Sequence, residues 1–465
     1  MPNPTEVVII KRDGSITPYT TYGSARADAV SGDLIQIRAD LNEQILLKNL
    51  VDIWIMPGVV IDFVAVSPTP PGPTITDNNT AVTCNIYGMG IIKNTDTTTS
   101  GRFECIKISN SNTKLSIECD YIEAVGSTVA SRSGPCIYIQ NGIKFHLICN
   151  KVYNKNNVAM WIGSLTTPII DINLNVKLVE TGIITTLDSG GSAIITHGNG
   201  FINIDEILCR NSGHCLSHRA GDMVARIKEL KTICNRAGQN IACVHIPSTT
   251  QGTGTQELIL YFDEIQCLKG NTGSSEVLSG SGVEATGGKS ILIGRRIFSS
   301  SSYAISYGGT QTNGGLLKCD EIVSESNIAI NLGTFLYEFN IIANYIEGNY
   351  TGIGNSVVIL TSGSSAIYTI KNSTIKNNNT SASSKGIYFE NINPIVTLNK
   401  VKIISGSENI NNIYLGNGNS IDVFNYGLFL NDGIDQDKII LKIGVGTNIL
   451  DPGYNYQCII DPLLS

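Results

Sequence analysis

Ile117-Glu118-Cys119-Asp120-Tyr121-Ile122 is a short stretch that the chain repeats, with apolar residues at the first, third and last places and Asp at the fourth. The same order returns in three other segments, Ile202–Ile207, Leu260–Ile265 and Leu317–Ile322. Looser copies have, in place of the Asp, the residues Asn150, Val176, Lys228, Gly294, Asn344, Asn372, Asn399 and Asn425. Successive copies lie about 23 to 35 residues apart, with an average of about 28, which is typical of a solenoid repeat.

A second strand-like segment follows most copies after a turn that contains Gly or Asn. These segments are Cys136–Ile139, Ala159–Ile162, Ala193–Thr196, Ala242–His245, Ala304–Tyr307, Ile328–Leu332 and Gly386–Phe389. Two or three short strands per repeat predict one coil of a parallel β-helix, because a leucine-rich repeat would need Leu at fixed offsets and a helical half. We predict that the recurrent Asp lies where a strand leaves for a turn and that its side chain binds the local backbone.

The composition agrees with a sheet-rich solenoid. Of the 465 residues, 42% are hydrophobic and 15% are charged, and there are 47 glycines. A chain of this length would ordinarily form several domains, but a solenoid grows by adding coils to one continuous core. The 32 basic and 39 acidic residues give a net charge of −7 without a basic run, so we expect no nucleic-acid binding.

The cysteines and the N-terminus bear on the compartment. Many of the 12 cysteines, such as Cys119 and Cys319, stand where other repeats have Ile or Phe, so we expect free, buried thiols and assembly in a reducing cytoplasm. There is no Cys-x-x-Cys, which argues against a zinc knuckle. We predict neither a secretory signal nor a membrane span, because no basic segment followed by an apolar run occurs at the start and no stretch of 18 apolar residues occurs anywhere.

The first 60 residues carry a resemblance to a known family. In order, they contain a strand, a turn, an Ala-rich helix, a Gly-Asp turn, an alternating strand and further strands: Val7–Ile10, Lys11–Gly14, Thr21–Val30, Gly32-Asp33, Leu34–Ile37 and Ile45–Gly58. This succession resembles the opening of pectin-lyase-like right-handed β-helix proteins, in which a helix caps the first coil. The resemblance implies an all-β, right-handed parallel β-helix with an N-terminal capping helix. Such helices occur in polysaccharide lyases, glycoside hydrolases, pectin methylesterases and the tail spikes and fibres of bacteriophages.

The resemblance also suggests how the chain is divided. We predict an N-terminal attachment segment at 1–20, the β-helix with its cap at 21–425, and a C-terminal cap or oligomerisation element at 426–465, where the repeat fades. Phage β-helix appendages, which this chain resembles, are commonly homotrimers. We therefore expect a homotrimer.

Three histidines end the second strands of consecutive coils, namely His197, His218 and His245. Since adjacent coils lie about 4.8 Å apart, these imidazoles could stack and bind a metal or orient an anionic sugar. The alternative is a ladder of polar side chains at a coil corner that binds nothing. With the residues nearby in sequence, the candidate binding set is His197, His214, His218, Arg219, Asp222 and His245. We assign no catalytic residue, no cofactor and no metal ligand.

Polysaccharide cleavage is the natural enzymatic alternative for this architecture, and glycosidases need two carboxylates a set distance apart. Asn94-Thr95-Asp96, Gly213-His214 and Arg226-Ile227-Lys228 resemble fragments of polygalacturonase motifs. However, no Asp-Asp pair occurs, residue 215 is Cys where the family has Gly, and the gaps differ from the family's. The pectin methylesterase signatures are absent.

Three hypotheses about function follow. The first is a non-enzymatic bacteriophage tail spike, fibre or decoration protein, located in the virion, that binds a host cell-surface polysaccharide or other virion proteins. The second is a polysaccharide lyase or glycoside hydrolase whose carboxylates are hidden among the acids Asp188, Asp205, Glu206, Asp222, Asp263 and Glu264. The third is a bacterial surface adhesin, which the missing export signal disfavours.

Overall fold

The computed structural model describes most of the chain. The described residues are 6–64, 72–96, 104–125, 134–182, 192–210, 213–234, 241–248, 252–270, 280–300, 302–311, 314–335, 339–349, 357–361, 367–371, 373–378, 385–389, 395–399, 402–405, 411–415, 420–422, 440–443, 448–450 and 457–460. They form two compact units, Met1–Ile227 and Lys228–Ser465, and each is described by itself. The boundary falls within strand β18 (Asp222–Cys234).

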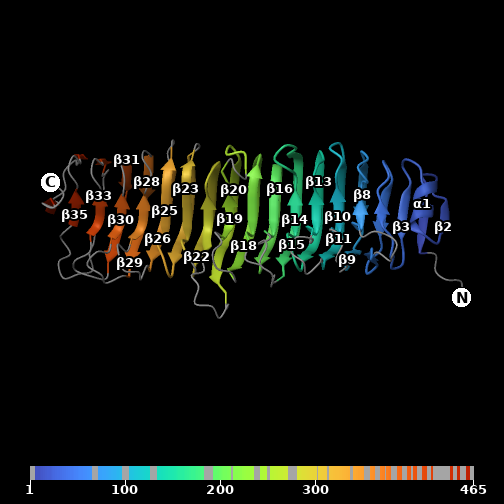
Figure 1. Ribbon diagram of the computed structural model, residues 1–465, viewed down its shortest axis with the longest axis horizontal. Coiled ribbons are helices and arrows are strands. Elements are labelled where there is room, and N and C mark those ends of the chain that lie inside the picture. The colour runs from blue at the N-terminus through green and yellow to red at the C-terminus, as the bar shows by residue number, and fades with distance from the viewer. Residues whose placement is uncertain are drawn as a thin grey trace. The chain divides into compact units, whose positions relative to one another are not determined.

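The first unit is a right-handed parallel β-helix with two sheets (Figure 1). Sheet A contains β3 (Leu34–Ile37), β5 (Asp52–Ile55), β6 (Val60–Asp62), β8 (Thr83–Tyr87), β9 (Ile91–Asn94), β11 (Lys114–Ala124), β13 (Lys144–Asn154) and β15 (Ile169–Thr181). Sheet B contains the shorter strands β4 (Ile45–Leu46), β7 (Ile75–Thr76), β10 (Ile106–Ile108), β12 (Ile137–Ile139), β14 (Met160–Ile162) and β17 (Leu216–Ala220). Strand β16 (Ile194–Cys209) belongs to both, because its start pairs with β14 and its remainder with β15. The predicted fold is confirmed.

The repeated Asp marks a bend inside a strand. In β11 the alternation of buried and exposed residues is interrupted after Cys119, where Asp120 and Tyr121 are both half-exposed. The two flanking halves of β11 pair with β13, whereas Asp120 has no paired residue. Its carboxylate accepts a hydrogen bond of 2.6 Å from Asn150 of the next coil. The prediction that the strand ends at the Asp is therefore wrong, because the strand continues and the side chain binds across coils.

The paired residues also correct two positions of the repeat. Val176 pairs with Cys149 and Ile204, so it is an inward residue one place before the Asp position. Gly294 likewise pairs with Phe262, and a Cβ at Gly294 would lie 2.4 Å from the Phe262 ring. The glycine is thus required by the large ring in the coil beside it. Aligning the repeats by sequence placed Val176 and Gly294 at the Asp position. It did so because neither residue is a polar side chain that would mark the correct register.

The N-terminal helix α1 (Tyr22–Asp28) forms where the sequence predicts it, at the blue end of the first unit (Figure 1). The Thr21 side chain accepts the Ser24 N–H at 3.1 Å and so caps the helix. Tyr22 is buried and its hydroxyl donates to the Leu46 carbonyl at 2.8 Å. The helix therefore covers strands of the first coil. Before it, β1 (Val7–Ile10) pairs antiparallel with β2 (Ile16–Tyr19) and with β3.

The second unit repeats the same two-sheet arrangement. Sheet A contains β20 (Glu257–Lys269), β22 (Lys289–Ser299), β24 (Gly315–Ser324), β26 (Phe339–Gly348), β28 (Ile367–Lys371), β29 (Thr374–Asn377), β31 (Ile395–Asn399), β32 (Lys402–Ser405), β34 (Ser420–Asp422) and β36 (Asn448–Leu450). Sheet B contains β19 (Ile241–Ile246), β21 (Gly280–Ala285), β23 (Ile305–Gln311), β25 (Ile330–Phe335), β27 (Val357–Thr361), β30 (Lys385–Phe389), β33 (Asn411–Leu415), β35 (Ile440–Ile443) and β37 (Gln457–Ile460). All of the predicted second strands lie in sheet B of one unit or the other.

The C-terminal strands continue the pairing of the coils. β35 pairs in parallel with β33 and with β37, and β36 pairs with β34. The pattern of strands therefore extends beyond residue 425, although the repeated motif is no longer recognisable in the sequence there. The roles of 1–20 as an attachment segment and of 426–465 as a cap or oligomerisation element stay predictions.

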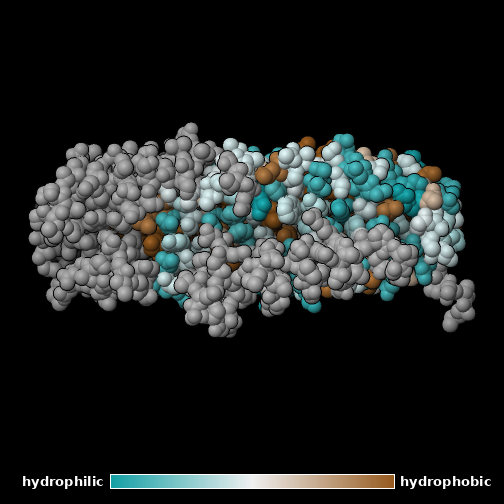
Figure 2. Space-filling model, viewed as in Figure 1, coloured by the Kyte–Doolittle hydropathy of each residue, from teal (hydrophilic) through white to brown (hydrophobic). Residues whose placement is uncertain are grey.

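The thiols and the surface agree with the composition. Ten of the described cysteines are buried and form no disulfide bond, as predicted: Cys84, Cys105, Cys119, Cys136, Cys149, Cys209, Cys215, Cys243, Cys267 and Cys319. On the face drawn in Figure 2, the described residues are mostly hydrophilic or neutral, with apolar ones in separate small groups. Among the described residues, no helical segment has the length and apolar character needed to cross the membrane.

Candidate functional site

Tyr138 and Trp161 lie side by side on the outer face of sheet B in the first unit. Each is the middle residue of a three-residue strand whose other two residues are buried, so both rings point outward. The two residues are paired in the sheet, and their ring centroids are 6.0 Å apart in an edge-to-face arrangement at 73°. Two half-exposed aromatic rings therefore share one surface.

His197 of β16 extends this aromatic surface by one ring. Its imidazole is stacked on Trp161, with centroids 6.4 Å apart and an interplanar angle of 17°. The side chain is 2% exposed, and its Nδ1 has no hydrogen-bond partner in the part of the chain that the structure describes. Burial, followed by the positive charge of Arg219 and the neighbouring His218, lowers the pKa of His197 to about 4. The imidazole is thus neutral at neutral pH.

A glycine allows the coils to approach one another here. Gly163 follows β14 with a φ of 81°, and a Cβ at this position would lie 2.1 Å from the His197 carbonyl oxygen. The indole Nε1 of Trp161 donates to the Gly163 carbonyl at 3.2 Å. Because any side chain at 163 would push the coils apart, this glycine fixes Trp161 beside His197.

Arg219 adds a positive charge to the rings. Its guanidinium carbon lies 5.9 Å from the centre of the Trp161 ring, and its Nε donates to the Ser217 hydroxyl at 3.1 Å. The sheet pairs Thr196 with His218 and His197 with Ala220, so Arg219 is the extra residue of a bulge. Burial lowers the pKa of Arg219, and among the described residues no carboxylate lies within ion-pair distance of it. The charge is therefore held half-buried, and no carboxylate of the described residues neutralises it.

His218 has a different environment from His197. It is fully buried, in the inward row of Ile162 and Thr196. Its Nε2 lies 2.9 Å from the Gly221 carbonyl, which only accepts, so Nε2 donates and Nδ1 accepts from the Thr196 hydroxyl at 3.0 Å. Both ring nitrogens are therefore used within the protein. Sequence spacing placed the two histidines near each other but could not show that they differ in this way.

The other predicted site residues are not shown in contact with this surface. His214 precedes β17, and its carbonyl accepts the Ala193 N–H at 2.7 Å. Asp222 is exposed, and its backbone N–H donates to the Asn199 side chain at 2.8 Å. His245 is buried in β19 of the second unit. Within the described residues, no group of three or more His, Cys, Asp or Glu side chains could hold a metal ion.

The structure thus collects Tyr138, Trp161, His197 and Arg219 into what we call the aromatic–cation cluster. The sequence predicts His197 and Arg219 as site residues, and it offers Tyr138 and Trp161 only as two of several aromatic residues on or near strands that could stack on a sugar. A signal for Trp161 was present. Aligning the segments Ala159–Ile162 and Ala193–Thr196 places it one coil away from the strand that leads into His197.

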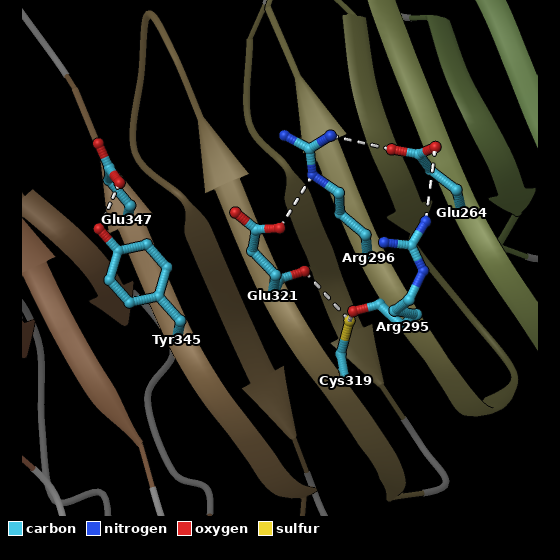
Figure 3. Close-up of polar contacts among 7 residues, drawn as sticks. All are labelled: Glu264, Arg295, Arg296, Cys319, Glu321, Tyr345 and Glu347. Carbon is cyan, nitrogen blue, oxygen red and sulfur yellow. Dashed lines mark hydrogen bonds and ion pairs between the residues drawn. The ribbon is translucent and has the colours of Figure 1, made fainter.

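Carboxylates on sheet A of the second unit bear on the enzymatic alternative. Arg296 bridges Glu264 at 3.0 Å and Glu321 at 3.1 Å, one residue per coil, and Tyr345 donates to Glu347 at 2.5 Å (Figure 3). Although burial acts to raise it, the hydrogen bond from Tyr345 and further donors lower the pKa of Glu347 overall. Glu347 is therefore ionised at neutral pH, and the row is a ladder of compensated charges.

The first unit has an equivalent ladder. Glu180 accepts from Lys151 at 2.7 Å and from Arg210 at 2.9 Å. Burial opposes these hydrogen bonds, but the net effect lowers the pKa of Glu180. Such carboxylates do not serve as the protonated acid that glycoside hydrolysis requires. Of the acids named for this alternative, Asp188 lies outside the described residues.

The fragments that resemble polygalacturonase motifs have structural roles. Asn94 is fully buried, and its amide donates to the carbonyls of Gly72 and Glu104, each at 3.0 Å. The Thr95 hydroxyl donates to Asp62 at 2.7 Å. The Arg226 guanidinium lies 5.8 Å from the Phe201 ring centre. These side chains hold adjacent coils together.

Comparisons of the chain with protein-family models, with curated proteins and with solved structures found no match.

Proposed function

We propose that this protein is a non-enzymatic bacteriophage virion protein that binds a host cell-surface polysaccharide carrying carboxylate groups, and that the aromatic–cation cluster is its binding site. The observation that supports this most directly is Arg219, a half-buried guanidinium beside Trp161 with no carboxylate within ion-pair distance among the described residues. Burying a charge without a partner is unfavourable, so such a group is well suited to an anionic ligand.

The surrounding side chains fit an acidic sugar. An indole ring presents an apolar face to the C–H groups of a pyranose ring, and Tyr138 lies at its edge. The guanidinium fork of Arg219 binds a carboxylate through two parallel hydrogen bonds. The Nδ1 of the neutral His197 ring has no partner among the described residues and can accept a hydrogen bond from a sugar hydroxyl.

The virion assignment rests on architecture. A parallel β-helix with an N-terminal capping helix is the arrangement of the phage appendages that the sequence resembles, and the proposal includes a homotrimer joined by 426–465. Genes for portal, capsid or tail proteins beside this one would support it. We expect a trimeric mass in solution for the full chain and a lower mass for a chain ending at Asn425. A monomeric full-length chain would exclude the trimer, and a trimer after truncation would move the contact elsewhere.

The binding site is tested with soluble polygalacturonate, hyaluronate and polysialate against uncharged dextran. Replacing Arg219→Ala should weaken binding of the acidic polymer at least about tenfold, since a hydrogen bond to a charged group contributes about 1.5 to 3 kcal/mol. Trp161→Ala should weaken it as well, and Arg219→Lys should recover part of it.

Arg226→Ala is the matched control, because Arg226 also lies over an aromatic ring in the first unit but outside the cluster. It should bind like the wild type. An Arg219→Ala variant that binds all acidic polymers unchanged, or a loss of the same size in Arg226→Ala, would contradict the proposed site.

A further inference from the structure

Four polar side chains form one row on sheet B of the second unit. The pairing of β19, β21, β23 and β25 matches His245 with Glu284, Glu284 with Ser306, and Ser306 with Asn331. On either side of each, the neighbours are buried: Val244, Ile246, Val283, Ala285, Ile305, Tyr307, Ile330 and Leu332. Because side chains alternate in a strand, the four polar ones point outward, one per coil and about 4.8 Å apart.

Asn331 ends this row with an unused acceptor. Its Oδ1 is buried and has no hydrogen-bond partner among the described residues. A buried acceptor without a donor costs about 1 to 3 kcal/mol, and native proteins rarely keep one without a reason. A donor from a ligand is a direct way to satisfy it.

Glu284 lies in the middle of the row without an ion pair or hydrogen bond from any described residue. Burial raises the pKa of Glu284, so its carboxyl group keeps a proton to higher pH than an exposed glutamate does. Of the groups that face it in the sheet, His245 on β19 is titratable and Ser306 on β23 is not. Lys289, which begins the next strand, is already paired with Glu257 at 3.1 Å. Below this raised pKa, Glu284 is placed to donate a hydrogen bond as a carboxylic acid.

We propose that the row His245, Glu284, Ser306 and Asn331, which we call the polar row, is a second binding site that takes an uncharged sugar chain through its hydroxyl groups. The row contains no Lys or Arg and has the acid Glu284 at its centre, so it favours an uncharged ligand over an anion. Hydroxyl groups both donate and accept, and they match an acid, an imidazole, an alcohol and an amide. A chain molecule lying along the stacking direction of the coils meets one of these groups per coil. This inference does not depend on the aromatic–cation cluster.

The test uses the labelled full-length chain on an array of uncharged and carboxylate-bearing oligosaccharides. Wild type should bind uncharged members, and Glu284→Ala and Asn331→Ala should each weaken that binding at least about tenfold. Glu284→Gln keeps a donor in place, so it should bind about as well as wild type at a pH below the pKa of Glu284. Wild-type binding should weaken as the pH rises through the pKa of Glu284, whereas Glu284→Gln should not respond in this way.

Two matched variants separate the sites. Asn344→Ala removes an exposed asparagine that binds Asp320 on sheet A, and it should leave binding unchanged. Binding of acidic polymers by Arg219→Ala is scored separately from binding of uncharged sugars by Glu284→Ala and Asn331→Ala, so failure at one site does not imply failure at the other. The proposal is overturned if the wild type binds no uncharged oligosaccharide on the array. It is equally overturned if Glu284→Ala and Asn331→Ala, shown by circular dichroism to be folded, bind these sugars like the wild type.

Discussion

The outer faces of sheet B differ between the two units, whereas the inner faces are alike. In the first unit the outward side chains include two aromatic rings and Arg219, which forms no ion pair with the residues that the structure describes. In the second unit the polar row has no Lys or Arg and centres on Glu284. The inward residues of both sheets are mainly Ile, Val, Leu and Ala with almost no exposure. The coils therefore constrain the inner positions by stacking and leave the outer positions free to carry different chemistry.

The two faces also respond to protons in opposite directions. Burial favours the uncharged form of each titratable group, and this lowers the pKa of His197 but raises that of Glu284. Both groups are therefore shifted toward their uncharged forms. A fall in pH should act on the first unit through His197, and a rise in pH through the raised pKa of Glu284 should act on the second.

The largest effect is expected from His197. Because its pKa falls from the ordinary 6.5 to about 4 on folding, its contribution to stability is fully present above pH 6.5 and is lost as the pH falls through about 4. This shift corresponds to about 3 kcal/mol of unfolding free energy. His197→Phe keeps a flat ring beside Trp161 but takes up no proton. Urea unfolding between pH 7 and pH 4, followed for both chains, should show a shallower acid limb in the variant.

The acid parts of the two stability curves must be compared because Glu180 and Glu347 also have lowered pKa values. Protonation of these two carboxylates destabilises the wild type and the variant equally in acid. The difference between the two chains isolates His197. If the stability of both chains falls equally with pH, protonation of His197 does not destabilise the folded protein. The difference between the outer faces of the two units would then depend on Arg219 alone.

Much of the fold follows from the sequence, but the sites follow only in part. Period-two alternation predicts the short strands, and an Ala-rich segment after Thr21 predicts α1, because both signals are local. Register is not local. The paired residues Met160 and Ile194 lie 34 positions apart (194 − 160), whereas Ile194 and Leu216 lie 22 apart (216 − 194). Turns of such different lengths prevent a fixed period from aligning the coils.

The bulge at Arg219 shows why only part of the candidate site could be predicted from the sequence. One extra residue in β17 places Arg219 beside Trp161, whereas His218 precedes the bulge and faces inward beside Thr196 by ordinary alternation. The residue types do not predict where this bulge occurs. In the second unit, the pairing of His245 with Glu284 spans 39 positions (284 − 245). From the sequence, His245 is therefore grouped with the other histidines at strand ends, and nothing places Glu284 beside it.

A smaller effect tests whether the interiors are as alike as the outer faces are different. In the first unit, Thr196→Val keeps the shape of the side chain but removes the hydroxyl that His218 Nδ1 accepts from, so a buried nitrogen loses its partner. In the second unit, Ser290→Ala removes the hydroxyl that lies 2.6 Å from the buried Tyr307 hydroxyl. Loss of one buried hydrogen bond of this kind should lower the unfolding free energy by about 1 to 2 kcal/mol in each case, because both bonds are shielded from water. Urea unfolding of the two variants at pH 7 measures this.

If the losses are equal, inward polar pairs stabilise the coils in the same way throughout. If Thr196→Val also weakens binding of an acidic polysaccharide while Ser290→Ala has no such effect, then the inward pair supports the bulge that aims Arg219, and the inner and outer faces of the first unit are not independent.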